Sequence, residues 1–284
     1  MGPIDTPLPD DCGQPGVQQN LTYMQGWIVG CIVNTTVELG DSKLDSHPIL
    51  AVTATSGTLS PYGFYSGHIG LAGDNVPLNK GPTTISALYQ SGQVPSGEVG
   101  LFLPRFDNTT QAEMTFGDPA TSPHADTSKA VALQSVDDPP FKYGYVVEFD
   151  SFKIGGQEIA AKNRTFLNTA STGISFPASL TEAIYRSLGW SRSDTDLGKA
   201  PCSPTIPDPY IVISFGGDQG QEFVVQYQDL VSRKADGSGE CWAMVTPSKG
   251  VFAETWIMGS PLFHNVYHSV DTQSGTVKMF GMRQ

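Results

Sequence analysis

Alternation of apolar and polar positions runs through most of this chain and predicts short strands in place of helices. The runs Leu21–Gly30 and Cys31–Gly40 are rich in β-branched residues and flank a glycine-containing turn, which predicts a hairpin. Tyr145–Ile154 also alternates and is followed by two glycines, as expected of a strand that enters a tight turn. Helical spacing of apolar residues is clearest in Ala178–Leu188, directly after a proline.

Composition supports the same class of fold. The 284 residues include 31 Gly and 21 Pro, and only 15% are charged, which suits many short strands joined by turns. This length fits one large all-β domain or two lobes. No run of eighteen apolar residues occurs, so we expect no membrane span.

The formal net charge of −12 disfavours nucleic acid or an anionic membrane surface as a partner. The five His residues show no metal-ligand spacing, and no Gly-x-Ser-x-Gly motif is present. We therefore expect neither a metal site nor a cofactor.

Signals for the cellular compartment point in two directions. Four Asn-x-Ser/Thr glycosylation sequons and an even number of Cys, four, favour an oxidising secretory compartment. The segment Met1–Asp5 has neither a charged nor an apolar leader region, so we expect no signal peptide in this chain. We favour a secretory protein whose leader is missing over a cytosolic one. The sequons are at Asn20, Asn34, Asn108 and Asn163.

The segment Phe166–Thr172 carries the most informative chemistry. Its order is an apolar lead-in, Asn168, Thr169, a small residue and two hydroxyl residues. It resembles the catalytic loop of the pepsin-like aspartic peptidases, where the corresponding triplet is Asp-Thr-Gly; here Asn168 and Ala170 replace the Asp and the Gly. A buried Asn-Thr turn would look similar in isolation, so the assignment depends on further landmarks.

Those landmarks follow in the family's order along nearly the whole chain. Tyr23, Gly26, Gly30 and Gly40 fit the frame of the family's flap hairpin, with Met24 in place of one Gly. Tyr23 alone would also fit an ordinary cross-strand packing position. The later landmarks are the strand and turn Gly67–Ala72, the short helix Thr84–Gln90, the strand end Glu113–Asp118, the run Trp256–Phe263 and the closing strands near Val270 and Met279.

The resemblance implies an all-β, bilobal pepsin-like acid protease fold with an incomplete first lobe and a cleft between the lobes. We expect a partial first lobe over residues 1–124 and a second lobe over residues 125–284, joined by the polar stretch between Pro119 and Pro140.

In this family each lobe supplies one carboxylate, and the two share a proton, so that one acts as base and the other as acid. An amide holds no charge at that position and cannot accept a proton from water. The resemblance therefore implies that Asn168 replaces the second catalytic Asp. Thr169 and Ser171 keep the supporting hydroxyls, whereas Ala170 adds a Cβ where the family has none.

The first motif has one candidate, Ile4–Asp10, in which Asp5 and Thr6 match the family's Asp-Thr. Pro7 has no N–H to donate to Asp5, and Tyr23 follows Asp5 by only 18 residues, fewer than in the family. Asp5 is thus either a remnant of the dyad or part of a disordered N-terminus.

The resemblance implies one disulfide, because Cys202 and Cys241 occupy the place of the family's second-lobe disulfide. Cys12 and Cys31 either pair with each other or stay free.

The sequence thus predicts a pepsin-like aspartic endopeptidase homologue that is impaired or inactive in peptide-bond hydrolysis. The alternatives are a non-catalytic protein that binds peptides or an apolar small molecule in the interlobe cleft, an enzyme of other chemistry, and a defective product without a stable fold. We expect a monomer that is secreted or vacuolar and has a peptide or protein as its partner.

Overall fold

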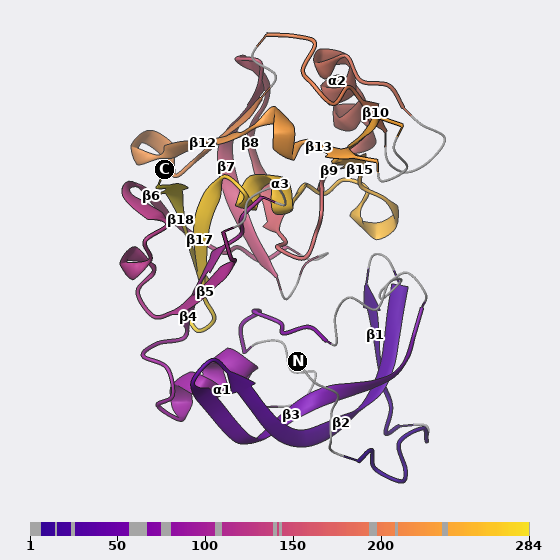
Figure 1. Ribbon diagram of the computed structural model, residues 1–284, viewed down its shortest axis with the longest axis vertical. Helices are drawn as coiled ribbons and strands as arrows, with labels where there is room; N and C mark the ends of the chain where they lie inside the picture. Colours follow the sequence, from indigo (N-terminus) through magenta and orange to yellow (C-terminus); the bar gives the residue numbers. More distant parts are fainter. Residues whose placement is uncertain are drawn as a thin grey trace. The chain divides into compact units, whose positions relative to one another are not determined.

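The computed structural model comprises two compact units, Met1–Gly97 and Glu98–Gln284 (Figure 1). Each unit is treated separately below. The structure describes residues 7–14, 16–23, 26–56, 67–74, 81–105, 110–138, 141, 144–192, 198–207, 210–234 and 238–283.

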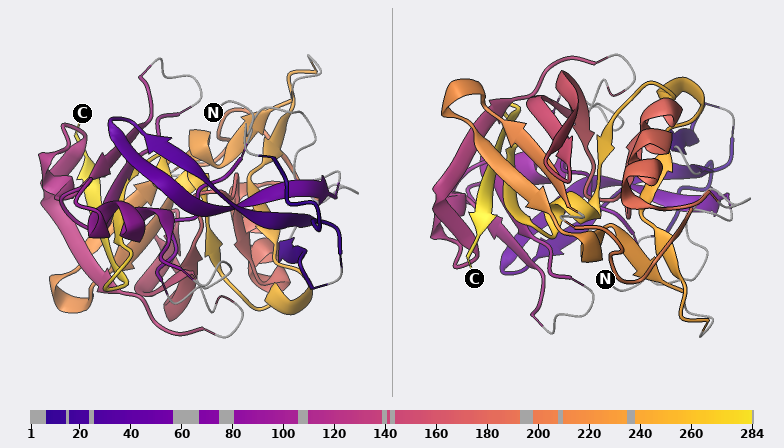
Figure 2. Two further views of the ribbon diagram at one scale, coloured as in Figure 1. Left: turned by 90° about the horizontal axis from the view of Figure 1, so that it is seen from below. Right: turned by 90° about the horizontal axis from the view of Figure 1, so that it is seen from above.

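The first unit is built on a long antiparallel ribbon (Figure 2). Its described residues form a three-stranded sheet in the order β1-β2-β3 and one short helix. The bounds are β1 Gln19–Tyr23, β2 Gly26–Leu39, β3 Ser42–Thr55 and α1 Thr84–Gln90. The short helix predicted at Thr84–Gln90 is confirmed.

The predicted hairpin is present, but its turn lies inside the first predicted run and not between the two runs. Tyr23 pairs with Gly26, and β2 then continues through Gly30, where its pairing with β3 shifts register. Gly30 is needed for close strand approach, because a Cβ there would overlap the carbonyl oxygen of Ala51. The prediction of a strand within Gly67–Ala72 is wrong, because these residues form no regular strand.

The second unit is larger and contains the main core. Among its described residues, one sheet has seven strands, in the order β12 Gln221–Val225, β11 Ile211–Phe215, β7 Tyr145–Ile154, β8 Gln157–Leu167, β16 Ile257–Met258, β9 Ile174–Phe176 and β15 Val245–Pro247. A second sheet has five, in the order β5 Glu113–Phe116, β4 Glu98–Phe102, β17 Val266–Asp271, β18 Thr276–Met282 and β6 Ala125–Gln134. A small sheet has the order β10 Lys199–Ala200, β14 Cys241–Ala243 and β13 Val231–Arg233. The α-helices are α2 Ala178–Leu188 and α3 Ser260–Phe263.

Two predicted elements have their expected bounds. Strand β7 spans Tyr145–Ile154 and is followed by two glycines with positive φ. Helix α2 spans Ala178–Leu188 and ends at Gly189 in the left-handed conformation, as glycine permits. Aromatic packing fills the core behind these elements, where Trp256 contacts three phenylalanine rings at centroid distances of 4.9 to 5.2 Å.

The stretch between Pro119 and Pro140, predicted as a connection, contains a ten-residue strand. Strand β6 pairs with β18 through a register shift next to Gly281. Six of its ten side chains are exposed and only two are buried, so its sequence shows no regular alternation of apolar and polar residues that would predict a strand. The compact units divide between Gly97 and Glu98, because β4 pairs with β17. The lobe boundary after residue 124 stays a prediction.

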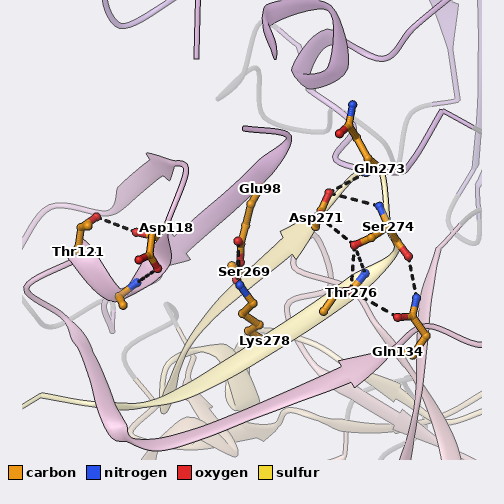
Figure 3. A network of polar contacts seen from close by, with 11 residues as sticks. Glu98, Asp118, Thr121, Gln134, Ser269, Asp271, Gln273, Ser274, Thr276 and Lys278 are labelled. Carbon is orange, nitrogen blue, oxygen red and sulfur yellow. Dashed lines mark hydrogen bonds and ion pairs between the residues drawn. The ribbon is translucent and has the colours of Figure 1, made fainter. Parts of the chain in front are cut away.

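Polar side chains fix the hairpin of β17 and β18 (Figure 3). Glu98 accepts hydrogen bonds from Ser269 Oγ at 2.7 Å and Lys278 Nζ at 2.9 Å, so it ties β4 to both strands. At the turn, Asp271 accepts from Gln273 N at 2.9 Å and from Ser274 Oγ at 2.8 Å. These bonds satisfy the turn locally.

An ion pair between the buried Asp229 and the partly exposed Arg105 joins distant segments of the same unit. Arg105 binds Asp229, in the 3₁₀ turn Tyr227–Asp229, in bidentate fashion at 2.7 and 2.8 Å. The amide of Asn265 completes the cluster, accepting from Arg105 and donating to Asp229, both at 2.8 Å. Every partner is satisfied, as a buried charge requires.

Both disulfides are formed. Cys202 and Cys241 are bonded with a Cα–Cα distance of 5.1 Å, which confirms the predicted pair. Cys12 and Cys31 are also bonded, at 5.8 Å, and this settles the alternative that the sequence left open. No helix in the described parts of the chain is both long enough and apolar enough to cross a membrane.

Candidate active-site loop

Asn168 begins a tight loop directly after β8. Its backbone N–H donates to the Met258 carbonyl at 2.9 Å, which continues the pairing of β8 with β16. Its side-chain Oδ1 accepts the N–H of Ala170 at 3.1 Å, and its carbonyl accepts the N–H of Ser171 at 3.0 Å. The amide is oriented with oxygen toward Ala170, because only oxygen can accept that hydrogen bond.

A second segment, Met258–Ser260, packs against this loop and is hydrogen-bonded to it. Ser260 donates to the Ser171 carbonyl twice, through its N–H at 2.8 Å and its Oγ at 3.0 Å. A Cβ on Gly259 would overlap the carbonyl oxygens of Gly173 and Ser171, so only glycine allows the two segments to lie this close. The loop is therefore rigidly positioned by backbone contacts.

The loop carries no charge. Residues 166–176 and 256–263 include no Asp, Glu, Lys, Arg or His. Asn168 is half-buried, and its Oδ1 occupies the position from which a carboxylate oxygen would accept the same N–H. An amide there can orient a ligand through hydrogen bonds, but it neither takes up nor releases a proton near neutral or acidic pH.

The three residues that follow Asn168 have different environments in the structure. Ala170 is exposed, and it does not have the positive φ that would favour glycine. The Oγ of Ser171 donates to the Gly173 carbonyl at 3.0 Å, and its predicted role in supporting a catalytic loop stays a prediction. Thr169 makes no hydrogen bond within the described residues, and its predicted role between the lobes stays a prediction.

The structure does not test the first motif. Asp5 and Thr6 lie outside the described residues. Tyr23 ends β1 opposite Gly26, but its side chain also lies outside the description. The roles predicted for these three residues therefore stay predictions.

Three of the four sequons lie on described strands. Asn20 on β1, Asn34 on β2 and Asn163 on β8 are all exposed, and Asn108 falls outside the described residues. Among the residues that are described, no three His, Cys, Asp or Glu side chains are placed to hold a metal ion.

The residues that build the loop from the other segment were missed as functional positions. Gly259 and Ser260 belong to the run Trp256–Phe263, which was recognised only as a landmark. Their contacts with Ser171 and Gly173 span about ninety residues of sequence, so no local sequence pattern predicts them.

The fold and the loop together define the class of this protein. A family model described as "Eukaryotic aspartyl protease" matches residues 13–280. The chain belongs to that family.

Curated relatives agree with this assignment. The chain is 24% identical over 260 residues to "Probable aspartic-type endopeptidase CTSD" of Arthroderma otae, covering 91% of this chain and 65% of the relative. It is 23% identical over 234 residues to "Vacuolar aspartic protease" of Candida albicans, covering 82% and 53%. It is 22% identical over 261 residues to "Cathepsin D" of Dictyostelium discoideum, covering 90% and 65%. The chain thus spans less than two thirds of the length of these relatives.

Proposed function

We propose that this chain is a pepsin-like aspartic endopeptidase homologue that is impaired in peptide-bond hydrolysis. The observation that carries the proposal is the Asn168 loop, in which an amide oxygen accepts the N–H of Ala170 at the position where the resemblance places a catalytic carboxylate. Hydrolysis in this family needs two carboxylates that exchange one proton. The two segments that build the loop, residues 166–176 and 256–263, contain no carboxylate that could replace the missing one.

Any residual activity would depend on Asp5, the one carboxylate in the register of the first motif. In that case Asn168 would serve as a hydrogen-bond partner of the substrate or of water, Thr6 and Thr169 would steady the two loops, and Tyr23 would close over the substrate. Loss of a general acid–base group typically costs about 10²- to 10⁴-fold in rate.

A cleavage assay tests this proposal. The purified chain is incubated with a denatured protein between pH 3 and 7, with and without a pepstatin-type inhibitor. We expect no inhibitor-sensitive cleavage, and such cleavage by the wild-type chain would overturn the proposal.

The restoring variant Asn168→Asp supplies the missing carboxylate in the same hydrogen-bonded position. We expect it to raise inhibitor-sensitive cleavage about 100-fold or more above the wild-type background. Asn168→Ala is the matched control, since it removes the acceptor of the Ala170 N–H and adds no carboxylate. If Asn168→Asp and the double variant with Ala170→Gly both stay silent, Asn168 is not the decisive defect and the first motif is.

Peptide binding without cleavage is the second candidate function. The contacts of Ser260 and Gly259 with the Asn168 loop favour this function. They hold the loop in a fixed geometry, which binding a peptide requires even where no cleavage occurs. Calorimetric titration with the pepstatin-type peptide should then give saturable binding to the wild type and weaker binding to Asn168→Ala. Absence of binding by the folded wild type would exclude this second function.

We further propose a monomeric glycoprotein of the secretory or vacuolar pathway. Two disulfides and exposed sequon asparagines support an oxidising compartment. Some relatives are named as vacuolar proteases. Fractionation of cells that express the tagged full-length protein tests the compartment, and light scattering tests the monomer.

A further inference from the structure

The described sequon asparagines share one feature. Each lies on a stretch of strand that is paired along one edge only. Asn20 is on β1, the edge strand of its sheet. Asn34 lies on β2 beyond Gly30, where the pairing with β1 ends. Asn163 lies on β8 before Phe166, where the pairing with β16 begins. Each stretch pairs with one strand, and within the described residues no second strand lies along its other edge.

The open edge of β8 can be assigned to particular backbone groups. The N–H of Phe166 donates to Trp256 O at 2.8 Å, and the N–H of Asn168 donates to Met258 O at 2.9 Å. Residues two apart in a strand direct their N–H groups to the same side. The pairing of β8 with β7 keeps one register from Leu167 back to Ala160. Arg164, Lys162 and Ala160 therefore direct their N–H groups to this side too, where β16 no longer reaches. An uncovered row of this kind is a template for another strand.

Asn163 sits directly at that edge. Its side-chain Oδ1 accepts the outward N–H of Arg164 at 2.8 Å, and its side chain is exposed. The amide Nδ2 makes no hydrogen bond within the described residues, so a group attached to Nδ2 would leave the bond to Arg164 intact. The preceding Lys162 has a φ of 23°, a left-handed conformation that bends the edge at the same point.

We propose that an N-linked oligosaccharide on Asn163 caps the open edge of β8 and keeps the chain from adding a strand there. In the transfer, Nδ2 of Asn163 bonds to C1 of the first sugar. The bond from C1 to the phosphate oxygen of a lipid pyrophosphate donor breaks, the lipid pyrophosphate leaves, and Nδ2 loses one proton. The bulky, solvated sugar then occupies the space that an added strand would need. This inference rests on the proposed secretory route and not on the proposed loss of hydrolysis.

The test compares two neighbouring substitutions in the full chain, secreted from a yeast host through a cleavable leader. Asn163→Gln removes the acceptor, whereas Thr165→Ser keeps the sequon and the hydroxyl that donates to Trp256 O. Peptide mass mapping measures occupancy, and light scattering after gel filtration measures the mass at increasing concentration. We expect a glycan on Asn163 and a one-chain mass for the wild type and Thr165→Ser. The Asn163→Gln variant should shift to two chains or more.

A second variant identifies the surface responsible. Ala160 shares the outward direction of Arg164, so Ala160→Pro removes an edge N–H that no described strand uses. Added to Asn163→Gln, it should restore the one-chain mass. Wild-type protein from a bacterial periplasm, which forms disulfides without N-glycans, provides an unmutated comparison and should associate like Asn163→Gln.

Three results would overturn the inference. One is an unmodified Asn163 peptide in the secreted wild type. Another is a one-chain mass for both unglycosylated preparations. The last is association that Ala160→Pro does not reverse. None of these bears on cleavage or on peptide binding, so this inference and the proposed function fail separately.

Discussion

His268 makes the stability of the second unit depend on pH in a defined direction. The side chain is 2% exposed in the middle of β17, between strand partners Leu101 and Met279, and its ring contacts Phe263 at 4.3 Å. Its Nδ1 has no hydrogen-bond partner among the described residues. Burial therefore disfavours the charged imidazolium and lowers the pKa of His268 from 6.5 to about 3.

The magnitude follows from proton linkage. Below pH 6.5 the unfolded chain binds a proton at this position, while the folded chain does not until the pH nears 3. Between pH 6.5 and about pH 3 the unfolded state binds more protons than the folded state, so the free energy of unfolding decreases as the pH falls through this range. Between pH 7.5 and pH 5, this single group removes about 2 kcal/mol of folding free energy.

The assay is urea unfolding of the wild type and His268→Leu at several pH values. His268→Leu has a similar volume and no titrating group, so its stability relative to the wild type should grow by about 2 kcal/mol between pH 7.5 and 5. Val147→Ala, a buried position on β7 in the other large sheet, is the control and should shift the free energy of unfolding by the same amount at each pH. Parallel pH curves for the wild type and His268→Leu would refute the reasoning.

Three further substitutions test packing in the second unit by thermal unfolding. Gly100→Ala places a Cβ against the Tyr267 hydroxyl and should cost about 1–3 kcal/mol; an unchanged Tm would mean that the ring moves freely aside. Asp229→Ala leaves Arg105 without its buried partner and should cost about 3 kcal/mol, and a smaller loss than from a surface carboxylate would contradict the pairing. Gly259→Ala forces its Cβ into backbone oxygens and should cost about 3 kcal/mol or more; wild-type stability would show that the two loop segments can separate.

Local patterns predicted several elements well because their stabilising features are local. Helix α2 follows from helical spacing between Pro177 and Gly189, and β7 follows from strict alternation before a glycine turn. The family landmarks placed Asn168 in a loop after a strand. Strand β6 escaped prediction because most of its side chains are exposed and its apolar residues do not alternate with polar ones, so its pairing with β18 is not announced by a local pattern.

The sequence by itself determined the chemistry at position 168, because an amide lacks the proton equilibrium of a carboxylate in any fold. It also determined the family, through the order of motifs along the chain. Only the tertiary structure decided that Ala170 needs no positive φ, that Gly259 and Ser260 hold the loop, and that Asn163 lies at an open edge. These facts depend on which distant segments lie side by side, and the free energy of those contacts appears only once the chain has folded.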